Sequence, residues 1–194
     1  RLAQIQVVVI AIGQGTLQFE NVLQKSKEIL ERLKNVDIRA KLDERDLRPG
    51  EKFFEWEKRG VPIRIEIGPK DLAADKVVLV RRDTSEKKDV NLKDLSQAIK
   101  DELELIQKNL FDRAFKYREA KTKKVDNWED FKTAIEDGNF VLAHWCGDKE
   151  VEAEIKKETQ ATIRCMSFET KDEDGKCVKT GKPSKRRVIF AKSY

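Results

Sequence analysis

The chain has 194 residues, which is enough for one large domain or two small ones. Charged side chains make up 40% of it, well above the usual quarter, and hydrophobic ones 39%, so the apolar core must be limited in size. The net charge of +5 is a mild basic excess. It permits an RNA partner but argues against a sequence-blind polyanion binder.

The cysteines and the apolar runs indicate the compartment. Cys146, Cys165 and Cys177 form an odd, sparse set that does not resemble the disulfide framework of a secreted protein, so a reducing, cytoplasmic setting is expected. The apolar run near the N-terminus lacks a small-residue cleavage site and is interpreted as a buried strand. No apolar stretch reaches the roughly 18 to 20 residues that cross a bilayer, so no membrane partner is expected.

The first part of the chain predicts an α/β domain. Residues 5–12 are nearly all apolar and β-branched, which is typical of a strand buried on both faces, and residues 19–34 have helical apolar spacing. Isoleucine alternates with charge over residues 63–67, so a half-exposed strand is expected, with Arg64 and Glu66 on one face. The other expected elements are strands at 37–42 and 77–81 and a helix at 53–59. The order βαβαββ predicts a mixed sheet flanked by helices.

A long amphipathic helix closes this first domain. From about residue 91 apolar residues recur every three or four positions, and the pattern continues toward residue 121. The basic run 121–124 is interpreted as a boundary, which divides the chain into a domain at 1–120 and a small α+β domain at 121–194. In the second domain helices are expected at 128–135 and 151–158, and strands at 140–145, 161–166 and 187–192.

Residues 42–72 contain most of the chemically informative side chains. A charged loop, an aromatic helix start and a strand with charges on one face bring acidic, basic and aromatic groups to one surface. Aromatic rings stack on unpaired bases, arginine forks onto guanine, and carboxylates accept from base amino groups. Mixed charge favours reading of base edges over gripping of phosphates. The alternative is a solvated strand face with ordinary salt bridges.

The same segment resembles the anticodon-binding domain that class II synthetases for histidine, glycine, threonine and proline share, and most narrowly the prolyl-tRNA synthetase family. The resemblance extends over essentially the whole chain, although Glu51 stands where the family often has an aromatic residue. It rests on Arg48-Pro49-Gly50, Lys52-Phe53, Glu55-Trp56-Glu57, Arg59-Gly60-Val61-Pro62 and Ile67-Gly68-Pro69-Lys70-Asp71-Leu72.

The resemblance implies a fold and a partner. The fold is the class II anticodon-binding domain, a mixed sheet flanked by helices, followed by a C-terminal extension. The partner is a proline tRNA, whose anticodon carries two adjacent guanines. The implied anticodon-binding residues lie among Arg48, Phe53, Glu55, Arg59, Arg64, Glu66 and Lys70.

The resemblance also implies that the chain is a C-terminal fragment of an enzyme that joins proline to its tRNA. That full-length enzyme uses ATP and magnesium and acts as a homodimer in the cytoplasm. The sequence has no match to the signature motifs of the catalytic domain, so no catalytic residue and no cofactor are expected in this chain. Alone, the chain is expected to be inactive as a ligase.

The cysteines raise the question of a metal site. Relatives with the C-terminal extension hold zinc through a C-x4-C pair and a later C-x2-C pair. Here Cys146 and Cys177 match the first and third positions, but Val151 and Thr180 occupy the second and fourth, so zinc is not expected. On residue types alone, the weak candidates for another metal site are His144, Cys146, Cys165 and Cys177.

Two other functions stay open at this point. One is a stand-alone tRNA-binding or regulatory protein that reuses the anticodon-binding fold; it predicts a start methionine where this chain has Arg1. The other is a small metal or thiol α/β protein built on the half that carries the cysteines. That protein would hold a bound metal or a reactive thiol and would need no RNA.

Overall fold

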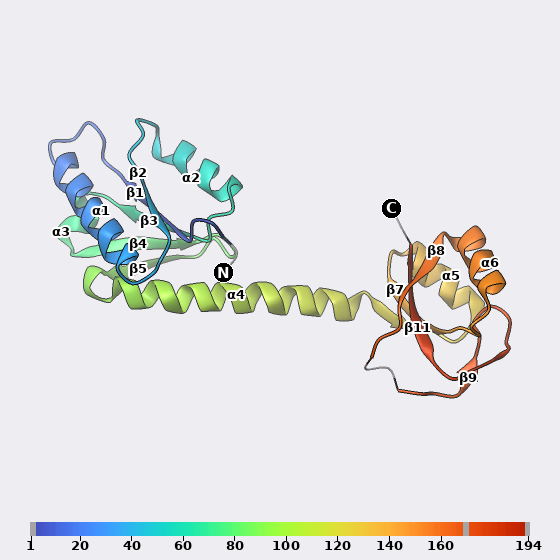
Figure 1. Cartoon of the computed structure of the whole chain (residues 1–194). Coiled ribbons are helices and arrows are strands. Elements are labelled where there is room, and N and C mark those ends of the chain that lie inside the picture. The colour runs from blue at the N-terminus through green and yellow to red at the C-terminus, as the bar shows by residue number, and fades with distance from the viewer. Residues whose placement is uncertain (1–2, 169–170, 193–194) are drawn as a thin grey trace. The chain divides into compact units, whose positions relative to one another are not determined.

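The chain divides into two compact units, residues 1–112 and residues 113–194. The computed structural model describes residues 3–168 and 171–192. Each unit has its own sheet and its own apolar core (Figure 1). Within the part of the chain that the structure describes, no helix is long and apolar enough to cross a membrane.

The first unit is built on a five-stranded sheet with the order β2-β1-β3-β4-β5. The first three strands run parallel, while β4 pairs antiparallel with β3 and with β5. This arrangement confirms the predicted mixed sheet. The strands are β1 (Val7–Ala11), β2 (Ala40–Asp43), β3 (Ile63–Ile67), β4 (Lys76–Arg81) and β5 (Lys87–Asn91).

Helices cover both faces of this sheet (Figure 1). On one face, α1 (Phe19–Lys34) and the first part of α4 (Leu95–Ala120) bury their apolar sides in the main core. On the other face, α2 (Pro49–Lys58) packs over β1. The short helix α3 (Pro69–Ala73) follows β3, and a 3₁₀ turn at Leu92–Asp94 precedes α4.

The start of α2 has a local cause. The helix begins four residues before the predicted position because Pro49 occupies its first turn, where a missing N–H is harmless and the fixed φ suits a helix. Arg48, the preceding residue, is extended, as proline requires of its neighbour. This boundary fixes which side chains α2 presents to the sheet.

Strand β3 is buried on both faces, so the expectation of a half-exposed strand was wrong. It lies between β1 and β4 in the middle of the sheet, and its isoleucines face the main core. Arg64 and Glu66 lie on the α2 side at only 8% and 7% exposure. They stay in this buried position because they pair with each other and with neighbouring charges.

Strand β5 is absent from the predicted elements. It is an edge strand, and Val90 is the single buried residue among its five. A strand of this kind shows no apolar alternation, so the sequence offers no periodic signal for it. Its presence matters because it extends the α2 side of the sheet beyond Glu66.

The second unit is a small α+β fold around a four-stranded sheet with the order β6-β7-β11-β8. Helices α5 and α6 pack against this sheet, and a hairpin of β9 and β10 precedes β11 (Figure 1). The basic run that was interpreted as a boundary forms β6, which pairs in parallel with β7. The elements are β6 (Thr122–Lys124), α5 (Trp128–Glu136), β7 (Phe140–His144), α6 (Lys149–Thr159), β8 (Ala161–Cys165), β9 (Gly175–Lys176), β10 (Pro183–Ser184) and β11 (Arg187–Lys192).

Caps and aromatic packing fix the two helices of the second unit. The side chains of Asn127 and Asp148 accept hydrogen bonds from the backbone at the starts of α5 and α6, both at 2.9 Å. Phe131 on α5 meets the edge of the Phe190 ring on β11, with centroids 5.1 Å apart. These contacts explain why the predicted helix starts lie within a few residues of the observed ones.

Candidate nucleic-acid interface

A row of alternating charges crosses the α2 side of the first sheet. Arg64 Nη1 lies 2.6 Å from Glu57 Oε1, and Arg64 Nε lies 2.9 Å from Glu66 Oε1. Lys87 Nζ lies 3.6 Å from Glu66 Oε2. The register of the sheet produces this row, because Arg64 pairs with Val80 and Val80 pairs with Lys87. We call Glu57, Arg64, Glu66 and Lys87 the charged ladder.

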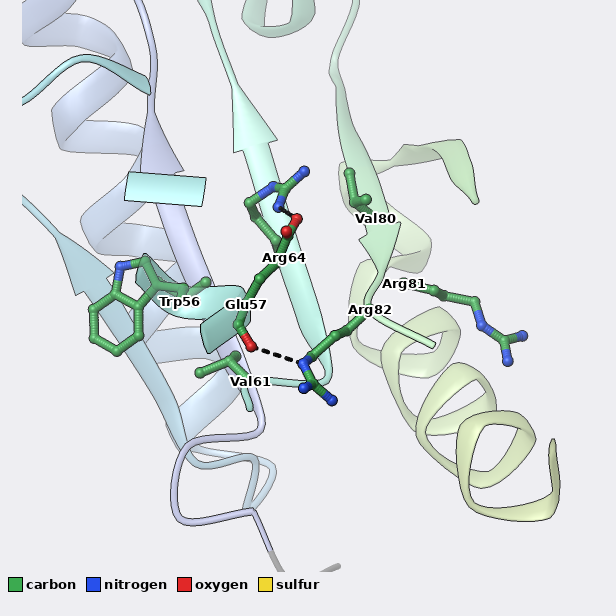
Figure 2. A pocket seen from close by; sticks show the side chains of 8 residues that line it. Trp56, Glu57, Val61, Arg64, Val80, Arg81 and Arg82 are labelled. Carbon is green, nitrogen blue, oxygen red and sulfur yellow. Dashed lines mark hydrogen bonds and ion pairs between the residues drawn. The ribbon is translucent and has the colours of Figure 1, made fainter. Parts of the chain in front are cut away.

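The Arg64 guanidinium is held from beneath by an aromatic ring. Its centre lies 4.1 Å from the centroid of Phe53, a side chain of α2. Figure 2 shows Arg64 beside Glu57, whose backbone carbonyl accepts from Arg82 Nε at 2.8 Å. The cavity among these side chains has about 10 Å³, room for about one water. A base therefore does not fit inside it.

Asp43 at the end of β2 anchors α2 to the sheet. Its carboxylate is 2% exposed and accepts from Trp56 Nε1 at 2.7 Å and from Arg45 Nη2 at 2.7 Å. Burial alone would raise the pKa of Asp43, but the hydrogen bonds from Arg45 and Trp56 hold that pKa well below its usual range. Lys52 Nζ donates to the Asp43 backbone carbonyl at 3.2 Å. The carboxylate is therefore ionised, and α2 is fixed by charge-assisted bonds.

A second ion-pair group lies on α2 next to this anchor. Glu55 accepts from Arg45 and from Arg59, each at 2.5 Å. The hydrogen bond from Arg45 lowers the pKa of Glu55. The Arg59 guanidinium lies 5.0 Å from the Trp56 ring centroid and is itself more than half exposed. Arg59 is thus a positioned cation at the surface, one turn of helix from the anchor.

The structure brings the sequence-predicted residues into two groups and leaves two outside them. Phe53, Arg64 and Glu66 belong to the charged ladder and its support, while Glu55 and Arg59 form the neighbouring ion pair. Arg48 is exposed at the start of α2 and Lys70 is exposed on α3. Neither has an ion pair among the described residues.

Sequence reasoning missed three charged residues of this surface, and the structure supplies them. Glu57 was in the quoted motif but was not a candidate, and its role follows from its contact with Arg64. Arg45 joins Asp43 to Glu55 from a loop with no periodic pattern. Lys87 reaches the ladder through the pairing of β5 with β4, which the sequence did not predict.

The second unit has no metal ligand at two positions of the zinc pattern that the family resemblance implies. Val151 is buried in the apolar core, and the Thr180 hydroxyl donates to Cys146 Sγ at 4.0 Å. Burial would raise the pKa of Cys177, but hydrogen bonds from Thr180 and from nearby backbone N–H groups lower it. Cys165 is exposed on β8. Within residues 3–168 and 171–192, no three His, Cys, Asp or Glu side chains are grouped to hold a metal ion.

His144 is a buried residue of the second core. It is 2% exposed, and its Nδ1 lies 3.1 Å from Ser184 Oγ. Ser184 Oγ donates to the Trp145 carbonyl at 2.8 Å, so its lone pairs face His144 and the imidazole carries its proton on Nδ1. Among the described side chains Nε2 is buried without a hydrogen-bond partner. Burial therefore favours the neutral imidazole, in which Nε2 carries no proton.

The second unit is expected to lose stability in two steps as the pH falls. Burial and the nearby charge of Arg187 lower the pKa of His144. Below about pH 6.5 the unfolded chain is therefore protonated at His144 while the folded chain is not, and the free energy of unfolding falls. Hydrogen bonds from Arg187 and Lys124 lower the pKa of Glu173 from 4.5 to about 2, so its stabilisation is lost between those values. Urea unfolding across pH 2 to 7 measures both steps.

Glu173→Gln tests the second step. Its free energy of unfolding should change less with pH between 4.5 and 2 than that of the wild type. The loss of stability that begins near pH 6.5 should remain. If the free energies of unfolding of the two proteins change equally with pH between 4.5 and 2, the assignment of that step to Glu173 is contradicted.

Comparisons with known proteins agree with the fold. A family model described as "Anticodon binding domain" matches residues 6–102, which places the first unit in the class of anticodon-binding domains. A second model, described as "Prolyl-tRNA synthetase, C-terminal", matches residues 128–194. The chain belongs to the prolyl-tRNA synthetase family.

Curated relatives cover the whole chain. It is 47% identical to a proline–tRNA ligase of Amoebophilus asiaticus, across 100% of this chain and 40% of that protein. It is 43% identical to one of Porphyromonas gingivalis (100% and 40%) and 46% identical to one of Chloroherpeton thalassium (100% and 42%). The chain therefore spans about 40% of the length of these relatives.

Proposed function

We propose that the first unit binds the anticodon of a proline tRNA through the charged ladder. The observation that carries this proposal is the Arg64 guanidinium, held 4.1 Å from Phe53 and paired with Glu57, whose side chain is 51% exposed. Glu57 can turn into solvent, and the buried Arg64 then keeps its ion pair with Glu66. When Glu57 is released, N–H groups of the Arg64 guanidinium become available to donate to the O6 and N7 atoms of guanine.

The neighbouring side chains supply the other contacts of this proposal. Phe54 on α2 is 69% exposed and offers a ring for stacking on an unpaired base. Glu66 accepts from base amino groups. Arg48, Arg59 and Lys70, all exposed, contact the phosphates around the anticodon.

The function of the whole protein is a further part of the proposal. The relatives carry the name proline–tRNA ligase, and this chain would serve such an enzyme as its tRNA-recognition part. The whole enzyme would use ATP and magnesium and work in the cytoplasm as a homodimer. Division of the chain into domains at 1–120 and 121–194 remains part of this proposal.

Binding to the anticodon stem-loop of a proline tRNA tests the proposal. The chain should bind this stem-loop more tightly than a copy in which both anticodon guanines are replaced. Equal affinity for the two, with a steep decline in salt, would reduce the interaction to phosphate attraction and overturn anticodon reading.

Arg64 variants are expected to lose guanine preference. Arg64→Ala should weaken binding of the guanine-bearing stem-loop by roughly 1–3 kcal/mol, because a forked contact is lost. Arg64→Lys keeps a charge next to Glu66 but not the fork, so it should lose most of the preference with less effect on folding. Isothermal calorimetry with both stem-loops measures the difference.

Lys100→Ala is the matched control, because Lys100 is an exposed cation on α4, away from the α2 side of the sheet. It should leave the guanine preference unchanged. If Arg64→Ala and Lys100→Ala weaken both stem-loops equally, Arg64 does not read a base.

A further inference from the structure

The second unit has a groove of its own, and nothing in the anticodon-binding proposal uses it. Its volume is about 390 Å³, within the range of small-ligand sites. The walls are mainly apolar and come from Trp145, Met166, Pro183 and Val188. A mainly apolar groove of this size on so charged a chain calls for a ligand with a flat or apolar part.

The unit that contains this groove carries most of the chain's net positive charge. Residues 113–194 contain 19 Lys and Arg and 15 Asp and Glu, so +4 of the chain's net +5 lies in the second unit. The stretch from 175 to 192 has no acidic residue at all. Its seven basic residues are Lys176, Lys179, Lys182, Lys185, Arg186, Arg187 and Lys192.

Three of these cations border the groove and are available to a ligand. Lys185 and Arg186 line it, and Lys176 lies directly across the β9–β10 hairpin from Pro183. The ammonium groups of Lys176 and Lys185 have no ion pair among the described residues. Arg186 pairs with Asp172 at 2.8 Å, but both side chains are about half exposed or more, so the pair exchanges easily.

The aromatic wall of the groove is held in place. Trp145 Nε1 donates to the Asp148 carbonyl at 3.2 Å, and the ring packs on the apolar core of the unit. A ring fixed in this way offers a preorganised stacking surface, and Met166, 56% exposed, adds a polarizable side chain beside it. Cations next to a stacking surface match a nucleotide, which joins a flat base to a phosphate.

We propose that this groove and its basic rim form a second RNA-binding site, which takes an unpaired nucleotide of the bound tRNA. The base lies against Trp145 and Met166, and the flanking phosphates contact Lys176, Lys185 and Arg186. The inference rests on the proposed function, because it assumes that RNA is the partner of the chain.

Binding of a uridine 12-mer to the whole chain tests the site without involving guanine. Lys176→Gln/Lys185→Gln should lower its affinity roughly ten- to thirtyfold at about 0.1 M salt, and should reduce the salt slope by about 1.4. Met166→Ala should lower it roughly fivefold, because stacking area is lost. An abasic 12-mer should bind the wild-type chain more weakly than the uridine 12-mer does. Its affinity should be the same for wild type and for Met166→Ala.

The control is Lys156→Gln/Lys157→Gln, which removes the same charge from an exposed stretch of α6 in the same unit. Equal weakening by the two double variants would overturn the site. If the abasic oligomer binds as tightly as the uridine 12-mer, base binding is overturned. If oligoglutamate of the same length competes as well as the uridine 12-mer, the basic rim binds acidic polypeptides instead, and the RNA site is overturned. Since the 12-mer has no guanine, these outcomes are independent of the stem-loop test of anticodon reading.

Discussion

Replacement of Gly175 by alanine is expected to lower the free energy of unfolding of the second unit by about 3 kcal/mol. A Cβ on Gly175 would lie well under 3.0 Å from three atoms of the His144 ring. The ring cannot move away, because it is 2% exposed and its Nδ1 is tied to Ser184. The strain must therefore be absorbed by the β9–β10 hairpin or by β7.

Hydrogen exchange followed by mass spectrometry measures this loss separately in each unit. Peptides of the second unit should lose protection, and those of the first should not. Gly50→Ala is the matched control, since Gly50 has no heavy atom within 4 Å of the added Cβ and lies in helix α2. It should be neutral or slightly stabilising.

A double variant identifies the clash itself as the cause. His144→Ala removes the ring, so the effects of Gly175→Ala and His144→Ala should fall short of additivity by at least 1 kcal/mol. Additive effects would mean that Gly175 is needed for some reason other than its contact with His144.

The sequence predicts the buried elements of this protein well, because they leave a periodic signal. Strand β1 and helix α1 were predicted at 5–12 and 19–34 and occur at Val7–Ala11 and Phe19–Lys34. Both are packed against the main core, and burial imposes continuous or helical apolar spacing on them.

The two edge strands that consist mostly of charged residues carry no such signal, and they were missed. Strands β5 and β6 lie at the edges of their sheets and are mostly charged, so their sequences read as loop or linker. The alternation of β3 was recognised, but it was interpreted as exposure. Alternation reports two different faces, and in β3 the charged face is covered by paired charges instead of water.

The candidate site shows the same limit. Residues 42–72, the segment singled out in the sequence, contain Phe53, Arg64 and Glu66, and the structure brings all three together through α2 and β3. Lys87 joins them only through the register of two antiparallel strands, which no local pattern encodes. The composition of the surface was predictable from one segment, but the partner of each charge depends on tertiary pairing.

Asp43→Ala is expected to lower the free energy of unfolding of the first unit by about 3 kcal/mol. The change leaves the buried Trp56 N–H without an acceptor, which costs about 1–3 kcal/mol, and it also removes the charge-assisted bonds from Arg45. Asp43→Asn keeps an oxygen for Trp56 but loses the charge, so a smaller loss is expected. Hydrogen exchange of peptides from the first unit, measured across a urea series, gives the free energy of unfolding of both variants.

The control is Asp46→Ala, because Asp46 is exposed in the same loop and no ion pair or side-chain hydrogen bond engages it among the described residues. It should change stability by less than about 0.5 kcal/mol. If Asp43→Ala is no more destabilising than Asp46→Ala, the carboxylate does not anchor α2.

The anchor also connects stability to function. Asp43 holds Trp56, and α2 carries Phe53 against Arg64, so loosening of the anchor should disturb the Arg64 guanidinium although no residue of the charged ladder is replaced. We therefore expect Asp43→Ala, measured where the protein is still folded, to lose guanine preference while keeping the salt-dependent affinity for phosphate. A destabilised variant with full guanine preference would show that base reading does not depend on how α2 is anchored.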